Sequence, residues 1–208
     1  MGATPADSTS SAQATAGLSV RAQYLIATAV YIAALGILFS PTIRSGATST
    51  NVENLQQSIS PWAAPTGPEQ YVSVAADQAQ GAYPRAVFLH HSLVANHELP
   101  LWDPLTFAGH PFLADGNLGP AYPPRLVLSV LLDPSWSHDI FVILHLLAAA
   151  LAMFALLKAF KVGFGGALLA GACWAFASYT LAWAPFEAIL PVAALLPLIL
   201  LSLWRWHE

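Results

Sequence analysis

The stretch that decides the fold class is AQYLIATAVYIAALGILFSPTI, residues 22–43. It contains no charged residue, and its length fits the roughly 20 apolar residues that a helix needs to cross a bilayer. A cleaved signal peptide is the alternative, but this apolar core is longer than the ~7–15 residues of a signal sequence, and no clear A-x-A site follows. We therefore predict a transmembrane helix over 22–43. A tail over 1–21, rich in Ser, Thr, Ala and Gly, is predicted to be disordered and cytoplasmic.

Three further apolar runs lie in the C-terminal part of the chain and predict transmembrane helices over 138–161, 162–185 and 188–204. The last run carries Pro191 and Pro197, which a membrane helix tolerates as kinks. Small residues, which let membrane helices approach closely, recur in the middle run. They are Gly163, Gly165, Gly166 and Gly171.

The composition agrees with lipid as the solvent. Hydrophobic residues make up 56% of the 208 residues and charged residues only 9%, against about 25% in soluble domains. The formal charge of −4 and the lack of any Lys/Arg run argue against a nucleic-acid partner. Cys173 is the single cysteine, which excludes an internal disulfide and a cysteine-based metal cluster. The predicted class is an all-α integral membrane protein with about four transmembrane helices.

The basic residues predict the orientation. Arg21, Lys158, Lys161 and Arg205 fall on one side if each apolar run crosses once, and the positive-inside rule makes that side cytoplasmic. We expect a multi-pass protein of the cell (plasma) membrane with both termini in the cytoplasm. Residues 44–137 then form a large external loop, and the short turn at 185–187 also lies outside.

The external loop is predicted to be ordered. Its many prolines and glycines fix backbone turns, and ordered loops on rigid scaffolds often carry function. The segment RLVLSVLL, residues 125–132, is apolar but too short to span, so we expect a re-entrant or interfacial helix there. Residues 82–93 mix apolar and polar side chains as a second interfacial helix would.

One loop segment carries a recognisable motif: HELPLWDPLTFAGHPFLADGNLGPAYPPRLVLSVLL, residues 97–132. It resembles the first-loop signature of bacterial YfhO-type membrane proteins of the GT-C glycosyltransferase superfamily, roughly G-x-x-P-L-W-N-P-Y, then G-x-P-F/L-x-A, then Y-P-P. The chain departs from that pattern at His97, where Gly is frequent, at Asp103, where Asn is common, and at Leu105, where an aromatic is common. The resemblance covers roughly residues 24–204.

The resemblance implies transfer of a sugar from a polyprenyl-phosphate-linked donor at the outer membrane face. Its catalytic residue is an acidic side chain of the first external loop, which by position is Asp77. Such a carboxylate can take the proton of the attacking hydroxyl. The leaving phosphate needs a cation, which Arg85, Arg125 or a divalent metal such as Mg or Mn can supply.

Further candidate substrate-binding residues come from the motif and from the second external turn. With the two arginines, the set is Arg85, Trp102, Asp103, His110, Asp115, Tyr122, Arg125 and Glu187.

Several of these residues have a structural alternative. Asp77 can be an ordinary solvated loop carboxylate, while Asp103 and Asp115 stand where aspartate commonly caps a turn. His145 lies near the outer end of a predicted membrane helix, where hydrogen bonding to a neighbour is the simpler interpretation. The loop histidines are numerous enough to raise zinc binding, although no H-x-x-x-H pair lies on a clear helix. They are His90, His91, His97 and His110.

Three functions are compatible with the sequence. GT-C enzymes have more membrane helices, so we expect this chain to match the N-terminal portion of such a protein, whose activity can require further membrane subunits. A non-catalytic membrane subunit or scaffold, with the loop as a binding surface, is the alternative. A transporter fragment is the weakest, because no charged residue lies mid-membrane.

Overall fold

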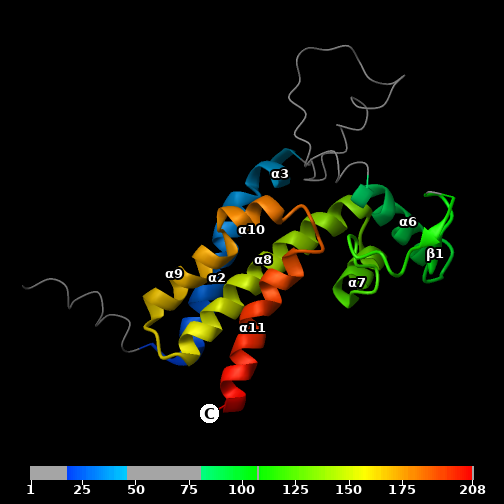
Figure 1. Ribbon diagram of the computed structural model, residues 1–208. Helices are drawn as coiled ribbons and strands as arrows, with labels where there is room; N and C mark the ends of the chain where they lie inside the picture. Colours follow the sequence, from blue (N-terminus) through cyan, green and yellow to red (C-terminus); the bar gives the residue numbers. More distant parts are fainter. Residues whose placement is uncertain (1–17, 46–80, 107, 208) are drawn as a thin grey trace, which may run out of the picture.

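The computed structural model describes residues 18–45, 81–106 and 108–207, which are mostly helical (Figure 1). Four helical segments in these ranges are long and apolar enough to cross a membrane. They are Val20–Leu38, Pro134–Ala159, Phe164–Trp183 and Leu190–His207. The prediction of a mainly helical membrane protein is therefore confirmed at this level, with four candidate spans. Most of the predicted tail, residues 1–17, lies outside the described residues.

The first span is helix α2 (Val20–Leu38), and the short helix α3 (Ser40–Ser45) follows it. The single helix predicted over 22–43 is therefore two helices in the structure. The Ser19 side chain caps α2 by accepting a hydrogen bond from the backbone N–H of Ala22 at 3.3 Å. Ser, Thr, Asp and Asn are preferred at this position because their side chains satisfy free N–H groups.

The second span, α8 (Pro134–Ala159), begins before the predicted start at residue 138 because its cap lies further upstream. Asp133 accepts hydrogen bonds from the N–H groups of Ser135 and Trp136, and Pro134 occupies the first helical turn. Proline is favoured there since its missing N–H would have no helical partner. The first turn of α8 consequently includes polar residues that the prediction assigned to the loop.

The third predicted helix, 162–185, is two helices, α9 (Phe164–Ala175) and α10 (Ser178–Trp183). Across the break, the hydroxyl of Thr180 donates to the carbonyl of Trp174 at 3.0 Å, which satisfies an acceptor that an unbroken helix would have used. The indole N–H of Trp174 donates to the carbonyl of Ala193 at 2.9 Å and ties α9 to α11 (Leu190–His207). Helix α11 accommodates Pro197 internally.

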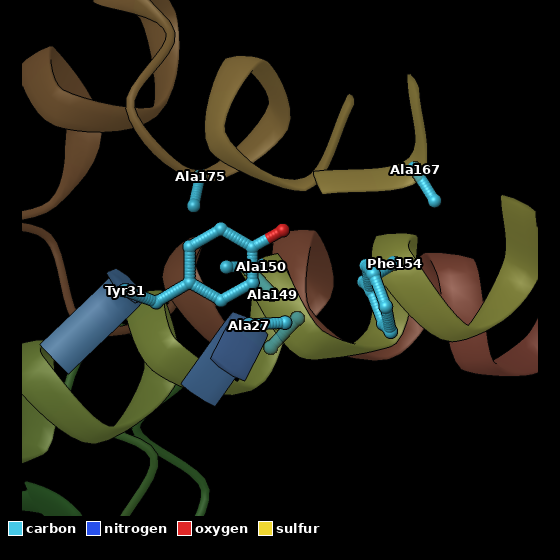
Figure 2. Close-up of a cluster of buried hydrophobic side chains, with 8 residues drawn as sticks. Ala27, Tyr31, Ala149, Ala150, Phe154, Ala167 and Ala175 are labelled. Atoms are coloured by element: carbon cyan, nitrogen blue, oxygen red, sulfur yellow. The ribbon is translucent and has the colours of Figure 1, made fainter. Parts of the chain in front are cut away.

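The bundle is built around α8, which packs against α2, α9 and α11. Figure 2 shows the main apolar cluster, where small side chains of α8 and α9 surround Tyr31 of α2. The Tyr31 hydroxyl donates to the carbonyl of Leu168 at 2.8 Å, so this polar atom in the core is satisfied.

Of the four glycines in the predicted small-residue series, Gly171 is the one that the packing requires. A Cβ atom there would lie 2.6 Å from the carbonyl oxygen of Ala150 on α8 and would also collide with the Tyr31 hydroxyl. Gly163 and Gly165 face open space, and Gly166 meets only the side chain of Val162. Close approach of α8 and α9 therefore depends on one position.

The basic residues used to predict orientation sit on helix ends that gather at one end of the bundle: the start of α2, the end of α8, the connection to α9 and the end of α11 (Figure 1). The opposite end carries α3 and the loop structure. Helices α6 (Tyr83–Val94) and α7 (Pro123–Leu131) pack on each other and on α8. Both predicted short loop segments are thus helical.

Candidate functional site

The motif segment forms a small hairpin between α6 and α7. Strands β1 (Trp102–Asp103) and β2 (His110–Pro111) pair antiparallel, with Trp102 opposite Pro111 and Asp103 opposite His110. The P-L-W and G-x-P parts of the motif are therefore direct neighbours. Gly109, at φ 109°, lies under the Trp102 indole, and an added Cβ would approach the indole Nε1 to 2.5 Å. Only glycine fits this conformation and this contact.

Two further motif residues adopt positive φ, His97 at 56° and Ala108 at 62°. Such values are uncommon for residues with a Cβ and are enriched at tight turns. His97 follows the end of α6, where it turns the chain toward the hairpin.

Asp103 organises the hairpin loop. One carboxylate oxygen accepts from the N–H of Leu105 and the other from the Thr106 hydroxyl, each at 2.8 Å. His110 Nδ1 lies 3.8 Å from the same carboxylate. The turn-capping interpretation of Asp103 agrees with these hydrogen bonds. Its predicted role in substrate binding stays a prediction.

Asp115 and Arg85, both predicted as site residues, contact each other. Asp115 accepts from the N–H of Asn117 at 2.8 Å and pairs with Arg85 Nε at 3.0 Å, which fastens the loop to α6. Beside them is a hollow of about 90 Å³. Arg85, Asp103 and Thr106 supply its polar wall. Here the structure brings a predicted arginine, Arg85, and a predicted aspartate, Asp103, to a shared concave surface.

A second group of polar residues is buried where α7 meets the bundle. Arg125 of α7 is fully buried and forms an ion pair with Glu187, from the turn between α10 and α11. Its guanidinium also donates to the Ser137 hydroxyl at 3.2 Å and lies 4.2 Å from the centre of the Phe141 ring. His138 Nδ1 donates to Glu187 at 2.5 Å. We call Arg125, Ser137, His138, Phe141 and Glu187 the junction cluster.

The charges of the junction cluster compensate each other. Burial alone would raise the pKa of Glu187, but the hydrogen bond from His138 and the charge of Arg125 outweigh it, so the pKa falls below its usual range. Burial lowers the pKa of Arg125, against the opposing charge of Glu187. A buried charge is tolerated only when it is paired in this way. The cluster therefore joins the loop, α8 and the second turn.

A third contact links the motif to α8. The Tyr122 hydroxyl lies 3.0 Å from His145 Nε2, and His145 Nδ1 lies 2.7 Å from the carbonyl of Phe141. Because a carbonyl only accepts, Nδ1 carries a proton, and in the neutral ring Nε2 accepts from Tyr122. Burial raises the pKa of the Tyr122 hydroxyl. The expectation that His145 hydrogen-bonds a neighbouring segment of the chain is confirmed, and the partner is the loop residue Tyr122.

Sequence reasoning named Arg125 and Glu187 separately and missed what joins them. Ser137, His138 and Phe141 belong to the first turns of α8, where a Ser-His-Asp sequence opens an otherwise apolar run. That cluster of polar residues at the start of a span was the available signal. Asp139, also in this turn, is buried as well.

The predictions of a catalytic Asp77 and of a metal site depend on which residues the structure describes. Asp77, the predicted catalytic residue, lies outside the described residues. Within residues 18–45, 81–106 and 108–207, no group of three His, Cys, Asp or Glu side chains is arranged to hold a metal ion.

The chain has no significant match among known family models, characterised proteins or solved structures.

Proposed function

We propose that this chain belongs to a GT-C-type membrane glycosyltransferase that acts on a polyprenyl-phosphate-linked sugar at the outer membrane face. The observation that supports the proposal is that separate parts of the motif contact each other in the structure. Its P-L-W and G-x-P parts pair as strands, and the Trp102 ring lies on Gly109. His97 has the positive φ that glycine, frequent at that place in the family pattern, adopts most readily.

In this proposal Asp77 is the general base and Arg85 faces the donor phosphate. Arg85 stands in the wall of the polar hollow and keeps some exposure to solvent beside its ion pair with Asp115. A cationic group there would favour charge that develops on the leaving phosphate. A divalent ion, Mg or Mn, is the alternative countercharge. The loop side is then the outer face, and both termini are cytoplasmic.

The test is sugar transfer by the full chain in vesicles that contain a labelled polyprenyl-phosphate sugar. Asp77→Asn keeps the shape of the side chain and removes the basic oxygen, so turnover should fall ~10²–10⁴-fold while donor binding survives. Asp103→Asn is the matched control, because its carboxylate is engaged in the turn and Asn is common at that place in the family; its effect should be mild. Full transfer by Asp77→Asn with loss in Asp103→Asn or Asp115→Asn would identify a different carboxylate.

A scaffold function is the second candidate, and one observation favours it. Arg125 and Glu187, predicted to bind substrate, are buried against each other, and Asp115 is held by Arg85. A loop whose charged groups are used internally is suited to present a fixed surface. If the full chain transfers no sugar from any polyprenyl-phosphate donor, with or without added Mg or Mn, while the loop remains folded, the scaffold function is the better account.

A further inference from the structure

An apolar groove of about 550 Å³ lies between α7, α8 and α11. Its volume is within the range of about 300–1,000 Å³ that is typical of sites for small molecules. The wall residues that matter here are Tyr122, Val127, Leu128, Leu144, Leu195 and Leu198. Helix α7 packs mainly on α6 and α8, so the groove separates it from α11.

The groove is continuous with the lipid-facing surface of the bundle. Leu144 belongs to one candidate span, and Leu195 and Leu198 belong to another. Val127 on α7 and Leu144 on α8 are each about half exposed, at 55% and 49%, although both are aliphatic. In a bilayer, the exposed Leu144 of a candidate span is covered by hydrocarbon, which favours a lipid chain as the occupant of the groove.

The lack of charged side chains among the described lining residues indicates which kind of lipid fits the groove. None of the described residues that line it is charged, and its polar groups are the Tyr122 hydroxyl and the His145 ring, which hydrogen-bond each other. Arg125, on the same helix, is turned into the bundle and paired with Glu187. An isoprenoid phosphate would bring net negative charge to a groove that has no cation among its described lining residues. A zwitterionic phospholipid carries no net charge.

We propose that this groove retains one acyl chain of a zwitterionic phospholipid, from the leaflet on the loop side, as a bridge between α7 and α11. The chain buries aliphatic surface that protein packing leaves open, which is the main favourable term for such binding. Its head group stays in the polar layer beside the start of α7. The proposal does not depend on sugar transfer, because the groove is distinct from the hollow beside Arg85.

The experiment uses the full chain in phosphatidylethanolamine vesicles that contain a phosphatidylethanolamine with a photoreactive acyl chain, and maps the labelled peptides. Labelling should concentrate on α7 and on the α8 residues around Leu144. Leu195→Trp and Ala148→Leu both fill the groove and should each reduce this labelling about tenfold, equivalent to roughly 1.4 kcal/mol. Leu200→Trp is the matched control, since Leu200 is exposed to a similar degree as Leu195 (45% and 43%) but does not line the groove.

Three results would overturn the proposal. Equal labelling in the filled variants and in Leu200→Trp would mean that the labelled lipid exchanges freely with the bilayer and is not held in the groove. Stronger competition by unlabelled polyprenyl phosphate than by unlabelled phosphatidylethanolamine would assign the groove to an isoprenoid. Labelling spread evenly over the lipid-facing helices would mean that no chain is retained. If Leu195→Trp fails to fold, the smaller change Ala148→Leu decides the outcome.

Discussion

The bundle core and the junction cluster lie along the same helix, α8, and are held together by different forces. In the core, Ala149 and Ala150 lie beside Tyr31, Phe154 packs edge-on against Tyr24, and close contact between apolar surfaces supplies the stability (Figure 2). In the junction cluster, two opposite charges from α7 and from the α10–α11 turn compensate each other in a buried site. The comparison predicts that the core responds to changes of volume, whereas the junction responds to changes of charge.

The largest effect should come from removing one charge of the junction cluster. Glu187→Ala leaves Arg125 buried without its counterion, which should lower the free energy of unfolding by about 3–5 kcal/mol. Thermal unfolding in detergent measures it. The double variant Arg125→Met/Glu187→Leu removes both charges and should lose much less. If the double variant is as unstable as Glu187→Ala, the pair does not act through charge.

The next largest effect concerns volume in the core. Gly171→Ala places a methyl group against the Ala150 carbonyl and the Tyr31 hydroxyl, so α8 and α9 must separate, at a loss of about 1–3 kcal/mol. Gly165→Ala, on the same helix in open space, is the matched control and should be neutral or slightly stabilising, because alanine favours helix over glycine. Equal effects of the two substitutions would contradict the described contact of α8 with α9.

Features that depend on local sequence could be predicted, whereas contacts between distant segments could not. The four spans are recognisable because a run of about 20 apolar residues is a local property of the sequence. The break between α9 and α10 escaped prediction because Thr180 satisfies the freed Trp174 carbonyl, a contact that hydropathy does not encode. The pairing of Arg125 with Glu187 joins segments distant in sequence, and no periodicity relates them. The hairpin bonds of Asp103 were predictable because turn capping is local.

Acid should destabilise the junction before it affects the core. The pKa of Glu187 is lowered from 4.5 in the folded state, so its contribution to stability is fully present above that value and is lost as pH falls through the folded pKa. Unfolding measured between neutral pH and the acid range should show this loss in the wild type. Glu187→Gln should show a flatter dependence, since it cannot titrate. Parallel pH curves for the two proteins would exclude Glu187 as the responsive group.

The smallest effect is expected at the other ion pair of the loop. Arg85 is partly exposed, so its contact with Asp115 is weakened by solvent, and Arg85→Gln should change the free energy of unfolding by about 0.2–1 kcal/mol. If Arg85 faces the phosphate, Arg85→Gln should reduce the free energy of donor binding in the vesicle assay by much more than it changes the free energy of unfolding. A loss of stability as large as that of Glu187→Ala would place Arg85 in a structural role instead.

Amide hydrogen exchange of the full chain in detergent shows whether the junction cluster holds the loop on the bundle. Glu187→Gln should increase exchange selectively in α6, the hairpin and α7, because Arg125 loses the charge that fixes α7. Gly171→Ala should increase exchange in α8 and α9 and leave the loop protected. Unchanged loop protection in Glu187→Gln, or the same exchange pattern in both variants, would show that other contacts hold the loop.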